Sequence, residues 1–270
     1  MASIIIAFGR DKASSAINYT SDLVAGEKVS IPENPNWRNE LSGVSQNTTF
    51  NTTPTQTSES ALTESTLTDT VSTAFISNYL ALKQNGNLNS TSAQDLIDKT
   101  ISYIGQNSSQ VTKISESQLN VVADNGNQSI MDYGENFGNI IKNNTHKEVE
   151  NELEIIMDAM NSKDSLKINE LNNIIAVYEK TFHELIKIPV PKTFVKVHLN
   201  LVNSINGIYL ALTEIKNVFS DPIRGLTALK NYKENATIFI QAKKALIDFI
   251  LKNNVVYKQG GGGYYLLNNI

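Results

Sequence analysis

The chain has 270 residues, of which 40% are hydrophobic and 19% charged, and its formal net charge of −4 argues against a general nucleic-acid binder. The apolar fraction excludes a disordered chain, and no apolar run reaches the roughly 18 residues of a membrane span. The absence of cysteine excludes disulfides, iron–sulfur clusters, thiolate zinc sites and cysteine nucleophiles, and three histidines leave little material for a histidine-rich metal site.

The N-terminus begins with a short apolar run, Ile4–Phe8, which is followed by the charged residues Arg10 to Lys12. The run is too short for a membrane helix or a full signal-peptide core. We interpret residues 1–12 as the remnant of a membrane anchor, which would place the rest of the chain outside the cytoplasmic membrane. The alternative is a short edge strand or helix tip that packs on the body.

A polar region follows the apolar run. Half of the 30 residues between 41 and 70 are serine or threonine, and such stretches bond locally to the backbone and bury too little apolar area for a core. Residues 13–58 are therefore predicted to form an extended arm.

From residue 59 onward the apolar residues recur at helical spacing. A first helix ends at Asn85-Gly86-Asn87 and is predicted to have one apolar face, made of Val71, Phe75, Tyr79 and Leu82. Ser90 or Thr91 is the expected N-cap of a second helix, whose face carries Ile97, Ile101 and Ile104. Residues 108–126 lack this spacing and predict a long connection with a short strand at Leu119–Val122.

Three more helices are predicted before residue 189. The first, which ends at Asn143-Asn144, carries Ile130, Tyr133, Phe137 and Ile140, and the second carries Val149, Leu153, Ile156 and Met160. The third begins near Asp164, and its seam comprises Ile168, Leu171, Ile175, Tyr178, Phe182 and Leu185. Pro189 and Pro191 end it, because proline cannot continue the hydrogen-bond ladder.

The sixth helix has the clearest pattern in the chain. Its apolar positions alternate steps of four and three residues without a gap, through Phe194, His198, Leu201, Ile205, Ile208, Leu212, Ile215 and Phe219. Such a seam is typical of a helix bundle, and a second stripe beside it places this helix in the interior. Asp221 and Pro222 supply an N-cap and a first-turn proline for a seventh helix, which runs to about Asn254.

Two glycine patterns are interpreted structurally. Gly134 and Gly138 form a small-xxx-small pair, which predicts a close approach of another helix. The run Gly260–Gly263 has no Lys-Ser/Thr after it, so we interpret it as a flexible linker in a tail of residues 255–270 and not as a phosphate loop. The predicted fold is therefore all-α, an up-and-down bundle of about seven helices over residues 59–254 with a polar N-terminal arm.

An acidic run is the first candidate for chemistry, and it comprises Glu148, Glu150, Glu152, Glu154 and Asp158. A di-iron bundle needs Glu-x-x-His pairs on two helices, and the sequence has none. Acidic residues also favour helix starts through the macrodipole. We therefore interpret the run as a solvated helix start.

His183 and His198 are the second candidate, because they lie nearly symmetrically about the turn at Ile188–Pro191. A metal between them would need a third ligand, for which Glu179 or Glu184 is available. We interpret His198 as a core histidine that bonds to a neighbouring helix, and leucine in its place is expected to cost little if the imidazole has no essential partner. We predict no catalytic, cofactor-binding or metal-binding residue.

Three stretches carry a family resemblance: YGENFGNIIKNN (133–144), IPVPKTFVKVHLNLVNSI (188–205) and FSDPIRGLTALKNY (219–232). Together they resemble an uncharacterised family of predicted membrane-anchored envelope proteins from reduced-genome candidate-phylum bacteria. The resemblance covers roughly residues 59–254 and implies an N-terminal anchor, a polar region and a helical body. It implies no catalytic residue and no cofactor.

These observations favour a non-enzymatic, extracytoplasmic interaction or structural protein anchored in the cell envelope, with a protein or another envelope component as its partner. An alternative is a subunit of a surface filament that packs through its apolar N-terminus. A weaker alternative is an extracytoplasmic hydrolase or metal-binding bundle, which no motif supports.

Overall fold

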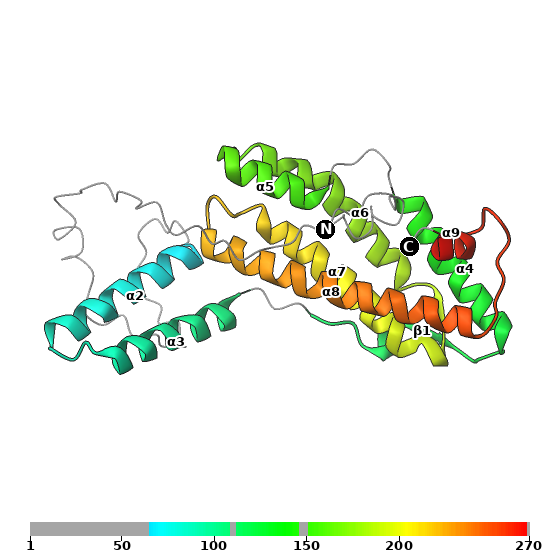
Figure 1. Ribbon diagram of the computed structural model, residues 1–270, viewed down its shortest axis with the longest axis horizontal. Coiled ribbons are helices and arrows are strands. Elements are labelled where there is room, and N and C mark those ends of the chain that lie inside the picture. Colours follow the sequence, from blue (N-terminus) through cyan, green and yellow to red (C-terminus); the bar gives the residue numbers. More distant parts are fainter. Residues whose placement is uncertain (1–64, 109–111, 146–150, 269–270) are drawn as a thin grey trace, which may run out of the picture. The chain divides into compact units, whose positions relative to one another are not determined.

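The computed structural model describes residues 65–108, 112–145 and 151–268 (Figure 1). These residues are mostly helical, and the one sheet among them has two strands of three residues. The predicted all-α helical bundle is confirmed. The anchor remnant at residues 1–12 and the arm at residues 13–58 lie outside the described residues and stay predictions.

The chain forms two compact units. The smaller unit contains the hairpin of α2 (Leu67–Gln84) and α3 (Ser90–Asn107), together with residues 220–224. A capping box between Thr66 and Asp69 starts α2. At its other end the predicted break is confirmed, and Gly86 there has a φ of 67°, which glycine adopts without strain.

The N-cap of α3 is Asn89, so the prediction of Ser90 or Thr91 is wrong. The Asn89 side chain accepts a hydrogen bond from the Ser92 N–H at 3.0 Å, and the Ser92 hydroxyl accepts one from the Asn89 N–H at 3.0 Å. This reciprocal pair is a capping box, and it starts α3 at Ser90.

Asp221 ties two helix starts together within the smaller unit. Its carboxylate accepts hydrogen bonds from the Leu67 N–H at 2.9 Å and the Thr68 N–H at 3.0 Å, both at the start of α2. It also accepts one from the Arg224 N–H at 3.3 Å, which confirms Asp221 as the N-cap of α8 (Pro222–Lys252). Burial alone would raise the pKa of Asp221, but the hydrogen bonds, led by that of the Thr68 hydroxyl, lower it.

The larger unit contains the remaining helices and both strands. Besides most of α8, its α-helices are α4 (Asn127–Asn144), α5 (Glu152–Ser162), α6 (Leu171–Leu185), α7 (Val195–Ile215) and α9 (Gly262–Asn268). Its strands are β1 (Asn120–Val122) and β2 (Pro189–Pro191). Among the described helices, none is long and apolar enough to cross a membrane.

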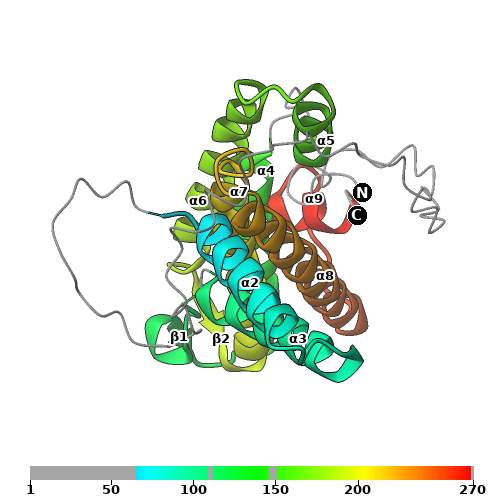
Figure 2. The same ribbon diagram turned by 90° about the vertical axis from the view of Figure 1, so that its left-hand side faces the viewer.

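Helix α7 forms the centre of the larger unit, as its seam predicts. Figures 1 and 2 show it between α6 and α8, and five seam residues are completely buried: His198, Leu201, Ile205, Ile208 and Leu212. The helix ends at Ile215, so the predicted extension to Phe219 is wrong, and Phe219 is exposed. After Ile215 the chain continues in turns, in which the N–H groups of Asn217 and Val218 donate to the carbonyls three residues earlier, each at 3.0 Å.

The short sheet joins two distant parts of the chain. β1 confirms the predicted strand, and it pairs in parallel with β2, with Val121 opposite Val190. The sequence predicts Pro189 and Pro191 only as helix stops. In the structure the proline rings, which fix φ, favour the extended conformation of β2. A two-stranded sheet tolerates prolines because both of its strands are edge strands.

Helix α9 packs closely on α4. A Cβ atom at Gly138 would overlap the carbonyl group of Gly262, so the predicted close approach of a helix is confirmed at Gly138. At Gly134 the close neighbour is the side chain of Tyr257, which precedes α9. The flexible linker predicted for Gly260–Gly263 is wrong, because Gly262 and Gly263 form the first turn of α9. Their N–H groups donate to the carboxylate of Glu135 on α4, at 2.8 and 2.9 Å.

Candidate functional site

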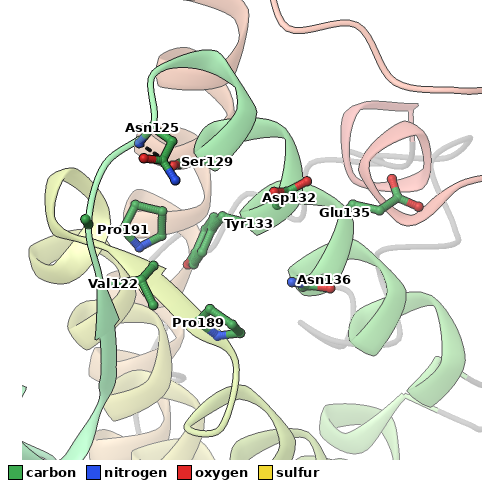
Figure 3. A pocket seen from close by; sticks show the side chains of 10 residues that line it. Val122, Asn125, Ser129, Asp132, Tyr133, Glu135, Asn136, Pro189 and Pro191 are labelled. Carbon is green, nitrogen blue, oxygen red and sulfur yellow. Dashed lines mark hydrogen bonds between the residues drawn. The ribbon is translucent and has the colours of Figure 1, made fainter.

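A pocket of about 410 Å³ lies between α4 and the two strands (Figure 3). Its lining comes from β1 and the loop after it, from α4 and from β2, and comprises Val122, Ala123, Asn125, Ser129, Asp132, Tyr133, Glu135, Asn136, Pro189 and Pro191. The parallel pairing of β1 with β2 creates this pocket, because it brings residues 122–125 and 189–191 together beside α4.

Helical spacing places the α4 residues of the pocket on one face. Ser129, Asp132 and Asn136 are separated by three and four residues, so they lie along one side of the helix. The Asn125 N–H donates to the Ser129 hydroxyl at 2.6 Å, which holds the loop after β1 against the first turn of α4. The polar side chains of α4 therefore form a row on one side of the pocket, and Val122, Pro189 and Pro191 of the two strands lie on the other side.

The pocket is acidic. It contains the carboxylates of Asp132 and Glu135 and no lysine, arginine or histidine. Glu135 is engaged by the two N–H groups of α9, whereas the single bond to Asp132 comes from Gln128 at 2.7 Å. The side-chain amides of Asn125 and Asn136 have no hydrogen-bond partner within the described part of the chain.

Tyr133 connects the pocket to the core. Its hydroxyl lies 2.8 Å from Nδ1 of His198, and its ring stacks on Phe194 with the centroids 4.6 Å apart. The predicted core histidine bonded to a neighbouring helix is confirmed, since the His198 side chain is completely buried.

The protonation of this pair follows from burial. Burial lowers the pKa of His198 to about 4, although the Leu185 backbone acts in the opposite direction, and burial raises the pKa of Tyr133. Both groups are therefore neutral at pH 7, and we assign the tyrosine as the donor to Nδ1. The hydrogen bond between the two buried side chains connects α4 to α7.

The two histidines do not form a common site. His183 is exposed and its ring lies against Phe182, with the centroids 5.1 Å apart. The proposed third ligands are engaged elsewhere, because Glu179 accepts a bond from Tyr209 and Glu184 one from Asn144. No group of three or more potential metal ligands occurs within the described ranges.

Glu152 corrects the interpretation of the acidic run. Its side chain is completely buried, and one carboxylate oxygen accepts hydrogen bonds from the hydroxyls of Tyr178 and Tyr232, each at 2.8 Å. The other oxygen has no hydrogen-bond partner among the residues described. Burial, followed by the nearby charges, raises the pKa of Tyr232.

The spacing of apolar residues in the sequence indicates that Glu152 is buried, although the acidic residues around it suggest a solvated helix start. Glu152 lies three and four residues before the buried Ile155 and Ile156, so it shares their face of α5. Glu154 and Asp158 are exposed, as a solvated helix start predicts, and Glu148 and Glu150 lie outside the described residues.

The α2–α3 hairpin presents a second candidate surface. Ile101 is 62% exposed, and Ile76, Tyr79 and Ile97 are about 40% exposed. The predicted core faces of the first two helices are therefore wrong at Tyr79, Ile97 and Ile101. Only four apolar side chains of the hairpin are buried: Leu67, Val71, Ala74 and Leu96.

Comparison with family models, curated proteins and solved structures finds no match to this chain.

Replacing His198 by leucine is expected to lower the free energy of unfolding by about 1–3 kcal/mol, because it leaves the buried Tyr133 hydroxyl without an acceptor. This corrects the expectation that leucine costs little, since the imidazole has a partner. Adding Tyr133→Phe should restore most of the loss, because both polar partners are then gone. Urea denaturation of the two single variants and the double variant measures the coupling, and simply additive losses would contradict it.

Proposed function

We propose that this chain is a non-enzymatic interaction or structural protein of the cell envelope, held outside the cytoplasmic membrane. The observation that carries the proposal is the apolar face of the α2–α3 hairpin, with Ile76, Tyr79, Ile97 and Ile101 open to solvent. Ile76 and Tyr79 are three residues apart on α2, and Ile97 and Ile101 are four residues apart on α3, so each pair lies along one side of its helix. Exposed apolar patches mark protein interaction surfaces.

The interior of the hairpin is small. Among the apolar side chains of α2 and α3, only Leu67, Val71, Ala74 and Leu96 are buried. Burial of the open face against a partner would remove further apolar area from water and so stabilise the hairpin.

Two further features support the proposal. The buried hydrogen bond between Tyr133 and His198 connects α4 to α7, which favours a structural role for this pair. The apolar run at Ile4–Phe8 and the Ser/Thr-rich sequence after it favour an envelope location. The partner on this reading is a protein or another component of the envelope, and a nucleic acid is disfavoured by the net charge of −4.

A photo-crosslinking residue in place of Ile101, expressed in the cells from which the chain comes, tests this proposal. The expected result is a discrete covalent adduct in the envelope fraction after irradiation. The matched control is the same residue in place of Asp95, an exposed position that lies on another side of α3, and it should give no such adduct. Equal adducts from both positions, no adduct from position 101, or a chain confined to the cytoplasmic fraction would contradict the proposal.

A further inference from the structure

We propose that Asn125 is a site of spontaneous deamidation, at which the backbone nitrogen of Gly126 attacks the side-chain amide of Asn125. The product is an aspartate or an isoaspartate at position 125, and either one carries a negative charge that asparagine lacks. The proposal is carried by the surroundings of the peptide group between these two residues. It does not depend on the α2–α3 hairpin or on the location of the chain.

The reaction needs only water beside the two residues. The Gly126 nitrogen forms a bond to Cγ of Asn125, the bond from Cγ to the side-chain nitrogen breaks, and that nitrogen takes up the Gly126 proton and leaves as ammonia. The product of this step is a succinimide ring. Water then opens the ring: addition at Cγ gives aspartate, and addition at the backbone carbonyl gives isoaspartate.

Glycine follows asparagine at three places in the sequence: Asn85–Gly86, Asn125–Gly126 and Asn206–Gly207. A glycine in the second position favours the reaction, because no Cβ crowds the attacking nitrogen. The third pair is buried in the middle of α7, where its glycine N–H belongs to the helical hydrogen-bond ladder. That pair cannot close a ring while the helix is intact.

The first pair lies in the turn after α2, which restrains it. Both residues are exposed, but the Gly86 N–H donates to the Lys83 carbonyl at 3.3 Å. Ring closure has to rotate the peptide group between Asn85 and Gly86 and therefore breaks this hydrogen bond. We expect the bond to slow the reaction there.

The second pair has no such restraint. Asn125 lies in the loop between β1 and α4 (Figure 3), and both Asn125 and Gly126 are exposed. Within the described part of the chain, neither the Asn125 side chain nor the Gly126 N–H has a hydrogen-bond partner. The Asn125 N–H donates to the Ser129 hydroxyl at 2.6 Å, but this N–H belongs to the preceding peptide group and not to the one that must rotate.

Deamidation at this position changes the charge of the pocket. Asn125 lines the pocket together with Asp132 and Glu135, and no basic side chain does. A carboxylate at position 125 therefore makes an acidic pocket more acidic. It also places a negative charge just before α4 begins at Asn127, where the helix dipole favours one.

Peptide mapping by mass spectrometry tests the proposal, with the full chain incubated in its folded state in mildly alkaline buffer and digested at acidic pH. We expect the succinimide and its products to form at Asn125 about two- to tenfold faster than at Asn85, the factor that one net hydrogen bond contributes. Asn206 should stay unmodified while the chain is folded. The rate at Asn125 should rise with pH, because the attacking nitrogen must lose its proton.

Two controls separate the effect of the fold from that of the local sequence. In guanidinium chloride the restraints of the folded chain are gone, so the three asparagines should react at similar rates. Asn125→Gln should remove the product at position 125 and leave the rate at Asn85 unchanged, because glutamine has to close a larger ring. The proposal is wrong if Asn125 reacts no faster than Asn85 in the folded chain, or if the unfolded chain keeps the ranking of the folded one.

Discussion

Replacement of Ile205 by alanine is expected to lower the free energy of unfolding by about 2–5 kcal/mol, the usual cost of a large-to-small change in a packed core. Ile205 is completely buried in the middle of α7. The tight packing of a protein interior leaves neighbouring side chains little freedom to fill the space of the lost methyl and methylene groups.

The matched control is Leu226→Ala, since Leu226 is 53% exposed on α8. This change should cost less than about 1 kcal/mol, as surface substitutions usually do. Urea denaturation of the two variants gives the comparison. Equal losses at Ile205 and Leu226 would show that α7 is not the centre of the core.

Replacement of Gly138 by alanine is expected to displace α9 and to cost at least about 2 kcal/mol. The added Cβ would overlap the backbone carbonyl of Gly262, which cannot rotate away as a side chain can. Displacing α9 removes its two hydrogen bonds to Glu135 and exposes Leu266, which is completely buried.

Urea denaturation, with hydrogen exchange at residues 262–268, measures this effect. The control is Gly105→Ala on α3, where a Cβ has no neighbour within 4 Å. That change should be neutral or stabilising by up to about 1 kcal/mol, because alanine favours a helix interior more than glycine. Unchanged exchange in α9 of the Gly138 variant would show that the helix does not depend on this contact.

The sequence predicted the features that local periodicity determines. The seam of α7 follows from steps of four and three residues, and the close approach of a helix at Gly138 follows from the absence of a side chain there. In both cases the residues that set the pattern lie within one helix, so the pattern can be recognised without knowing the partner.

The features that the sequence did not predict depend on distant partners. The turn of α9 at Gly262 needs Glu135, which lies 127 residues away, and a glycine run alone is typical of a linker. Glu152 shares a face of α5 with buried isoleucines, but the hydroxyls that bond its carboxylate come from tyrosines on α6 and α8. The pocket needs the pairing of β1 with β2, and its wall comes from prolines that a sequence indicates only as breaks.

Hydrogen exchange of the purified chain tests the central claim, that the α2–α3 hairpin is incomplete without a partner. We expect the amides of α2 and α3 to exchange by local opening, with a free energy several kcal/mol below that of the most protected amides in α7, because so few of the hairpin's apolar side chains are buried. Amides in both helices of the hairpin that exchange only with global unfolding, as those of α7 should, would contradict the account.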